Sequence, residues 1–386
     1  MSFIFKKAYR NIFLLCLLFA TSTYAASSAD SSLTNNIRHE YVSPRALGMG
    51  DAFTAVADDH NVLFYNPAGL AFLTESDLNL KLQGGIADGT YNFTQDMKAA
   101  LDKSTDSEKV SAVTTLLQNN YGKDYWLRPT IGGIYAKPRW GMAFIPIDFD
   151  LTLSLHQQVG PTLNVEAYQD STLAFGYAWL MDQDKLGIGI LPKAVYRAYV
   201  GKAVPAGEML VNSEYFTKQD AQEGLTFDMD VGVMHKLNNW GIVKPTVSFV
   251  ARNIVDYGFK QNLHLIDGNS ASEPPTLGRR FDLGTAWEFP NWGMFSPKAT
   301  LDMRDMGHKY WTWWKGLHMG AEFMFDAAWW ARAALRGGFS QGYISAGGSV
   351  VFAWFRLDVA TWGEEMGTSN ARRQNRRYIF SASLDF

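Results

Sequence analysis

The sequence predicts an all-β protein, a transmembrane antiparallel β-barrel of about 14 strands. Three features of the 386 residues predict this class. The N-terminus has the form of an export signal, the body alternates apolar and polar residues in short segments, and the final segment is an amphipathic strand rich in aromatic residues.

Residues 1–25 have the three parts of a secretory signal peptide. Basic residues come first, the apolar run IFLLCLLFA follows, and small residues lead to a cleavage site after Ala25. The run is too short to cross a bilayer as a helix. We therefore expect residues 1–25 to be removed, together with the single cysteine, Cys16, so that the mature chain forms no disulfide. A retained anchor and lipid attachment to Cys16 are the alternatives.

The segment 73–386 is predicted to form the barrel. Leucines at 78–82 alternate with polar residues, and segments of this kind recur to the end of the chain. No later segment is apolar over 18 residues, so no transmembrane helix is expected. Strands in a bilayer must close on themselves, because lipid offers the backbone no hydrogen-bonding partner. The other candidate strands lie at 128–137, 139–148, 170–181, 186–191, 223–236, 244–253, 281–288, 297–305, 319–326, 329–338, 341–351 and 354–362.

Three stretches interrupt the strands. Residues 93–120 are rich in helix formers and have apolar residues at helical spacing, which predicts two short amphipathic helices in an extracellular insert. The polar stretches 201–222 and 256–278 are predicted loops. Tryptophans gather near the predicted strand ends, as in the aromatic girdles of membrane barrels. The alternative for the cluster at 310–314 is a platform that stacks on carbohydrate.

The last strand alternates an apolar face, with Tyr378, Phe380 and the terminal Phe386, and a mostly polar face. This pattern is similar to the C-terminal signal that the barrel assembly machinery recognises in bacterial outer-membrane proteins, so that machinery is an expected partner.

Four arginines precede or begin this strand: Arg372, Arg373, Arg376 and Arg377. The strand must start at the outer leaflet, where these side chains would pair with lipopolysaccharide phosphates. A basic loop that contacts only water is the alternative.

The stretch PRALGMGDAFTAVADDHNVLFYNPAGLA, residues 44–71, resembles the N-terminal hatch of the FadL/TodX superfamily of outer-membrane proteins, which includes PorV-like and TraF-like members. The resemblance implies a 14-stranded barrel with residues 26–72 as a hatch in its lumen. It also implies that Asn66, Pro67 and Ala68 belong to the hatch. The residues agree, because Asn is a good helix N-cap and Pro is favoured at the first helical position.

Gly48 and Gly50 in the same stretch predict either positive φ or a close backbone approach inside a crowded lumen. The superfamily pattern has a third glycine where this chain has Asp51, which adds a charge to the hatch and weakens the expectation that the hatch moves. Neither a phosphate loop nor a metal site is predicted. The stretch lacks the lysine of a phosphate loop, and the adjacent residues 58–60 cannot all face one ion.

The predicted function is that of an outer-membrane channel of a Gram-negative bacterium for passive uptake of long-chain fatty acids or other hydrophobic small molecules. A non-transport component of a secretion or conjugation apparatus is the alternative. The seven histidines stand in no catalytic setting, so no enzyme, catalytic residue, metal or cofactor is expected. A net charge of −3 without a basic cluster of the nucleic-acid-binding kind predicts no nucleic-acid partner. The expected partners are outer-membrane lipid, lipopolysaccharide and a hydrophobic ligand.

Overall fold

The computed structural model describes residues 35–157, 161–207, 217–237, 241–266, 272–328, 330–368 and 371–385. The expected signal peptide and the terminal Phe386 lie outside these residues, as do two of the tryptophans near strand ends, Trp240 and Trp329. None of the helices in this part of the chain is long and apolar enough to cross a bilayer.

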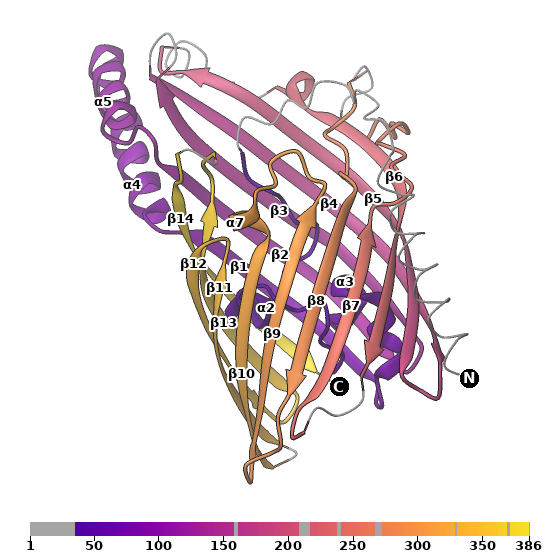
Figure 1. Ribbon diagram of the computed structural model, residues 1–386. Coiled ribbons are helices and arrows are strands. Elements are labelled where there is room, and N and C mark those ends of the chain that lie inside the picture. The colour runs from indigo at the N-terminus through magenta and orange to yellow at the C-terminus, as the bar shows by residue number, and fades with distance from the viewer. Residues whose placement is uncertain are drawn as a thin grey trace. The chain divides into compact units, whose positions relative to one another are not determined.

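Fourteen antiparallel strands form one closed barrel in the described residues, which confirms the predicted class (Figure 1). Each strand pairs with its neighbours in the sequence, and β1 pairs with β14 to close the ring. The strands are β1 Asp77–Ala87, β2 Asp124–Lys137, β3 Trp140–Gln157, β4 Pro161–Met181, β5 Leu186–Pro205, β6 Gln222–Lys236, β7 Lys244–Arg252, β8 Arg280–Glu288, β9 Phe295–Met306, β10 Leu317–Ala328, β11 Ala331–Ser340, β12 Tyr343–Phe352, β13 Phe355–Glu365 and β14 Gln374–Asp385.

The two ends of the barrel differ. At one end, here named the turn end, β1 begins, β14 ends and several neighbouring strands are joined by a few residues. The opposite end, named the loop end, holds the longer connections. Strands β3 to β5 have 18 to 21 residues, whereas β11 to β14 have 10 to 12. A strand of 9 to 11 residues spans a bilayer core, so the long strands extend beyond it.

Alternation along the strands separates two environments. In β1, Leu80 and Leu82 face outward and are exposed, whereas Asn79, Lys81 and Gln83 face the lumen and are buried. The same division recurs around the ring, where the outward positions are mostly apolar and many buried inward positions are charged. An apolar exterior around a polar interior is the arrangement that a bilayer selects for a barrel.

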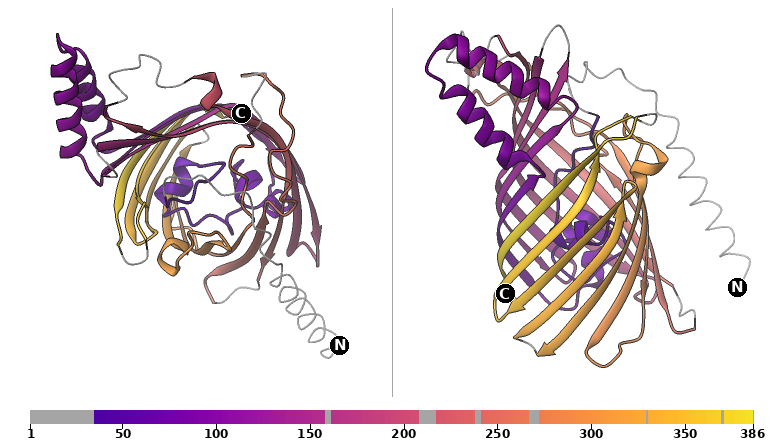
Figure 2. Two further views of the ribbon diagram at one scale, coloured as in Figure 1. Left: turned by 90° about the horizontal axis from the view of Figure 1, so that it is seen from above. Right: turned by 90° about the vertical axis from the view of Figure 1, so that its left-hand side faces the viewer.

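The lumen is occupied by the chain's own N-terminal residues. We name residues 35–73 the lumenal segment; it contains α2 Pro44–Gly48, α3 Val62–Tyr65 and the 3₁₀ helix η2 Pro67–Phe72. Viewed down the barrel, these elements lie inside the ring of strands (Figure 2). Of the hatch expected for residues 26–72, the structure describes residues 35–72.

The predicted helical insert is present at the loop end as α4 Thr90–Leu101 and α5 Asp106–Asn119 (Figure 2). Thr105 caps α5 by accepting a hydrogen bond from the Glu108 N–H at 3.3 Å, and the glutamate side chain bonds back to Thr105. Phe93 and Leu117 belong to one apolar cluster with Leu163 of β4. The helices therefore rest on the part of the long strands that extends beyond the bilayer.

The remaining connections contain little regular structure. The short 3₁₀ helix η3 Lys218–Asp220 precedes β6, and α7 Trp313–Gly316 precedes β10. The predicted loop 201–222 is wrong at its start, because β5 continues to Pro205, and at its end, because β6 begins at Gln222. The predicted loop 256–278 contains no named strand in its described residues.

Candidate functional site

The lumenal segment contacts the wall through backbone that only glycine permits. Gly50 has φ +67°, and a Cβ on it would collide with backbone atoms of Met319 and Phe339. Gly48 has no positive φ, but a Cβ there would lie 3.0 Å from the Cα of Gly347 on β12. Gly50 thus meets both of the requirements expected from the sequence, and Gly48 meets one of them, the close backbone approach.

Asp51 follows directly, and its backbone also has a left-handed conformation, with φ +61°. Its carboxylate is buried, accepts a hydrogen bond from the Tyr65 hydroxyl at 2.7 Å, and pairs with the Arg304 guanidinium from β9. Arg304 Nη1 also donates to the Asp51 carbonyl oxygen at 2.8 Å. The charge that replaces a glycine is therefore compensated by the wall and joins the segment to it.

Asn66 caps η2 as the sequence predicts. Its side-chain oxygen accepts from the Ala68 N–H at 3.0 Å, and Pro67 occupies the first helical position. The same amide donates to the Thr54 carbonyl oxygen at 2.9 Å. Asn66 is completely buried, beside Gly232 of β6, where a Cβ would collide with it. This triplet therefore fixes a helical turn directly against the wall.

Arg45 of α2 binds carboxylates from two directions. Its guanidinium donates to Asp58 at 2.7 Å and to Asp59 at 2.8 Å within the lumenal segment. It also pairs with Glu322 of β10, which accepts a second guanidinium, that of Arg336, at 2.7 Å. A planar fork of donors suits such multiple pairing. The two aspartates therefore act as partners of an arginine.

A second group of ion pairs holds the part of the segment nearest the loop end. Arg38 donates to Asp170 of β4 at 2.9 Å, and Glu40 accepts from Arg280 of β8 at 2.6 Å. Burial alone would raise the pKa of Glu40, but Arg280 holds it well below its ordinary value. Arg252 of β7 donates to the carbonyl oxygen of Tyr65 at 2.8 Å. The segment is thus bound to the wall by charges on several sides.

One side of the lumenal segment is apolar instead. Leu63 and Leu70 are fully buried in a cluster that includes Ile134 of β2, Ile145 of β3 and Leu191 of β5. Apolar burial of this kind supplies most of the packing free energy of an interior. The lumen therefore has a charged side and an apolar side, and the apolar side lies against β2 to β5.

Strand β3 is irregular where it borders this apolar side. Its register shifts against β2 between Phe144 and Ile147, and against β4 between Ile145 and Asp148. Residues 141, 143 and 145 face inward before Pro146, and 148 and 150 face inward after it. Among the described strands, β3 alone shifts register against both neighbours. Proline has no N–H to give to a ladder, so the bulge weakens the wall on both edges of β3.

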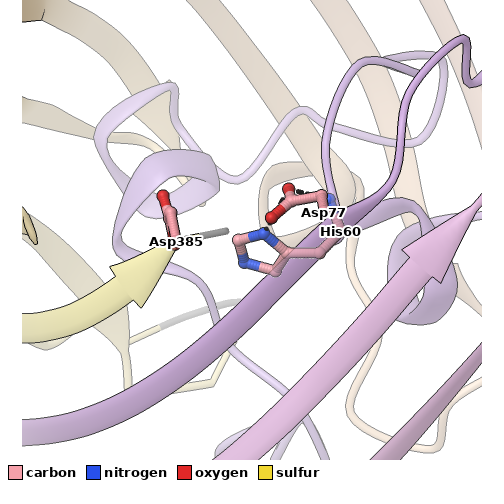
Figure 3. A group of neighbouring side chains, drawn as sticks. All are labelled: His60, Asp77 and Asp385. Atoms are coloured by element: carbon pink, nitrogen blue, oxygen red, sulfur yellow. Dashed lines mark hydrogen bonds and ion pairs between the residues drawn. The ribbon is translucent and has the colours of Figure 1, made fainter. Parts of the chain in front are cut away.

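At the turn end, His60 of the lumenal segment meets both strands of the barrel's closure (Figure 3). Its Nδ1 lies 2.8 Å from an oxygen of Asp77, the first residue of β1, and Asp385 of β14 completes a group whose ligand atoms lie within 4.8 Å of one another. A histidine and two carboxylates are metal-binding types, but Arg356 lies 3.3 Å from Asp385 and competes with a cation. Burial acts to lower the pKa of His60, the Asp77 carboxylate acts to raise it, and the net direction is upward.

The four arginines near the last strand have different surroundings. Arg377 is buried in the lumen, 3.8 Å from Glu364, and so does not face the outer leaflet. Arg372 pairs with Glu365 at 3.0 Å and Arg373 with Asp124 at 2.9 Å. Arg376 lies on the outward face and forms no ion pair with any residue that the structure describes; its guanidinium donates to the Ile344 carbonyl oxygen at 2.6 Å. Its outward neighbours Tyr378 and Phe380 are exposed.

The cavities differ in size and lining. A cavity of about 500 Å³ lies at the turn end, and its lining includes Arg45, Asp59, Arg336, Arg356 and Asp385. Two voids of about 20 Å³ lie between the lumenal segment and the wall, each large enough for about one water molecule. These two voids are therefore much smaller than a ligand site, which typically has 300 to 1,000 Å³, whereas the cavity at the turn end falls within that range.

Comparisons with known proteins are informative at the level of fold. No protein-family model matches the chain, and no curated protein matches its sequence. Similar solved structures include the Ralstonia pickettii toluene transporter TbuX, with 10% identity, a TM-score of 0.46, and coverage of 90% of this chain and 99% of that one. The Pseudomonas putida toluene transporter TodX has 10% identity, a TM-score of 0.46, and coverage of 90% and 98%. A Pseudomonas aeruginosa FadL homologue has 9% identity, a TM-score of 0.47, and coverage of 91% and 99%.

These structures are of the kind that residues 44–71 resemble, but with TM-scores below 0.5 they carry no argument about substrate or mechanism. The class follows from the chain's own structure. A closed ring of 14 strands with an apolar exterior and a charged interior is a transmembrane β-barrel of the outer-membrane type. Its lumen holds a segment of the same chain.

The sequence predicted the lumenal glycines, Asp51 and the Asn66 cap, but it did not predict their partners on the wall. The sequence did contain a signal for charged partners on the wall. Pairs such as Arg280 with Asp282, and Asp302 with Arg304, stand two residues apart and so share the inward face of one strand. Opposite charges repeated at this spacing indicate a wall that carries an ion-pair network.

Proposed function

We propose that this protein is an outer-membrane channel of a Gram-negative bacterium for the passive uptake of hydrophobic small molecules, with long-chain fatty acids as the substrate class. The turn end faces the periplasm and the loop end the exterior, since bacterial barrels have short periplasmic turns. The resemblance of residues 44–71 to the FadL/TodX hatch supports this proposal, and so does the asymmetry of the lumen.

The β3 bulge is the observation that carries the proposal. The bulge contains Pro146 and lies beside Ile145, which belongs to the apolar cluster of the lumenal segment. On the outer side, Phe144 and Ile147 are exposed to lipid. An apolar molecule at this point has apolar groups on both sides of the wall, and a weakened ladder lies between them. Lateral exit through the bulge avoids the charged cavity at the turn end.

Uptake of radiolabelled palmitate by cells with and without the gene tests transport. Equal uptake would contradict the transport proposal as a whole. The route is tested with a disulfide across the bulge, in the double variant Ile145→Cys and Thr172→Cys, whose residues are register partners on β3 and β4. The mature chain has no other cysteine once residues 1–25 are removed.

The crosslinked double variant should lose gene-dependent uptake and regain it when the disulfide is reduced. The matched control is Val350→Cys with Leu357→Cys, register partners on β12 and β13 in a regular ladder, which should transport normally when crosslinked. Undiminished uptake through the crosslinked bulge would reject lateral exit and leave the transport proposal standing.

A non-transport role in a secretion or conjugation apparatus is the second candidate. The ion pairs of Arg38, Glu40, Arg45 and Asp51 with the wall favour it, because breaking buried pairs one by one is costly. Such a segment suits a fixed scaffold. Co-purification of periplasmic or surface proteins with the barrel, together with gene-independent palmitate uptake, would favour this role.

A further inference from the structure

The outer surface of the barrel carries an apolar groove of about 600 Å³ on β11 to β14 and β1. The groove exists because outward positions on neighbouring strands hold small residues or none. Gly84 has no atom within 4 Å of the position of a Cβ. On β12, Ala346 has only a methyl group and Gly348 has no side chain, whereas larger side chains line the sides of the groove. Its lining includes Leu335, Gly348, Val359, Tyr378 and Phe380.

The strand register places these residues in adjacent rows. Thr361 pairs with Ala346 on one side and with Tyr378 on the other. In the next row toward the turn end, Phe380 pairs with Val359 and with Gly84. The recess thus crosses five strands whose ladders are regular at these positions. The recess results from small outward side chains on a regular part of the wall, and it is separate from the β3 bulge.

Arg376 lies at the end of this groove nearest the loop end. It is the third residue of β14, and it shares the outward face with Tyr378 and Phe380. Its register partner on β13 is Gly363, which has no side chain, and the guanidinium extends to the Ile344 carbonyl oxygen on β12. Strands β11 to β14 have the length of a bilayer core. Arg376 therefore stands at the depth of lipid headgroups.

The charge of Arg376 is available to a ligand. The other three arginines of the cluster pair with carboxylates, as described above, but Arg376 forms no ion pair within the described residues, and its exposed neighbour Asp88 is not within pairing distance. A guanidinium binds phosphate through paired charge-assisted hydrogen bonds. An apolar groove below an unpaired guanidinium at headgroup depth matches one kind of molecule, which has acyl chains below a phosphate.

We infer that this groove is a specific site for one phosphate-bearing lipid of the outer leaflet, with an acyl chain on Gly84 and Gly348 and a phosphate on Arg376. The site lies on the outside of the wall. The inference therefore does not depend on whether the barrel transports hydrophobic molecules. It narrows the lipopolysaccharide contact expected for the four arginines to one of them.

Native mass spectrometry of the delipidated barrel in mild detergent, titrated with lipid A, tests the inference. One lipid A should remain bound per barrel, and lipid A stripped of its phosphates should bind about tenfold more weakly. Arg376→Gln should reduce lipid A binding by about the same factor and leave binding of the dephosphorylated lipid unchanged. Arg332→Gln, the same change of charge at the turn end, should bind as the wild type does.

Gly84→Phe fills the groove from a different strand and should weaken both lipids, whereas Gly84→Ala should have little effect. Three results would overturn the inference: equal effects of Arg376→Gln and Arg332→Gln, normal lipid A binding by Gly84→Phe, and displacement of lipid A by equimolar inorganic phosphate. Circular dichroism confirms that each variant keeps its β-sheet, and the two strands give independent variants if one does not fold.

Discussion

Asp51 and Arg304 form a buried ion pair between the lumenal segment and β9, at a backbone position that is left-handed and thus suited to glycine. The protein accepts the unfavourable backbone conformation of a non-glycine residue, which typically costs 1 kcal/mol or more, and gains a charged link to its wall. This ion pair therefore fixes the lumenal segment at the position where the FadL/TodX pattern has an uncharged glycine.

Asp51→Gly tests this link. The substitution relaxes the backbone and keeps the hydrogen bond from Arg304 to the carbonyl oxygen of residue 51, but it leaves Asp282, at 3.9 Å, as the nearest carboxylate to the guanidinium. We expect a net loss of about 1–3 kcal/mol in unfolding free energy, because a buried charge loses its closest partner. Denaturant unfolding in detergent micelles measures it. Asp88→Asn, at an exposed position, should change stability little; a more stable Asp51→Gly protein would show that the pair is not stabilising.

Gly50→Ala should destabilise the protein far more than a neutral glycine change. Alanine at φ +67° is strained, and its Cβ would meet backbone atoms that cannot rotate away. We expect a loss of more than about 1 kcal/mol, measured by the same unfolding curve. The control is Gly84→Ala, because Gly84 has ordinary φ and open space around it. Equal stability of the two variants would contradict the close packing of the segment.

Asn66→Ala should remove the cap of η2 and leave the Ala68 N–H without its partner. We expect a cost of about 1–2 kcal/mol for the whole barrel, because the cap is completely buried. Thr105→Ala removes a comparable cap from exposed α5 and should make that helix accessible to protease while the barrel stays stable. Unfolding curves and protease digestion of the two variants measure this difference. An Asn66→Ala protein that becomes protease-sensitive but keeps the stability of its barrel would contradict the prediction.

Retention of the lumenal segment should depend on pH through His60. The pKa of His60 is raised in the folded state, so its charged contact with Asp77 stabilises the protein fully below its ordinary value of 6.5. That contribution is lost as the pH rises through the raised folded value. Limited proteolysis of the segment should therefore accelerate with rising pH above about 6.5. His60→Gln should remove most of this pH dependence, and an unchanged profile would exclude His60 as its source.

The strands could be predicted because lipid and lumen impose opposite requirements on alternate residues. All candidate segments correspond to strands, but those of β3, β4 and β5 were too short. Beyond the bilayer, the inner and outer faces of these strands no longer differ, since the helices cover Leu163 and Val165 of β4. The alternation of lipid-facing and lumen-facing residues is not required there, so the apolar-polar pattern ends before the strand does.

The ion pairs could not be predicted in the same way. Asp51 and Arg304 are 253 residues apart, and their contact depends on barrel closure, strand register and the path of the lumenal segment together. The position of Pro146 within a strand pattern was a signal for a bulge. Its importance came only with the apolar cluster behind it, which the topology assembles from four strands and two short helices.

His60 meets Asp77 and Asp385 at the seam where β1 and β14 close the ring. The lumenal segment therefore contributes a side chain to the joint between these two strands. A barrel without its lumenal segment would lack this contact at its seam, so the closed ring and the filled lumen support each other.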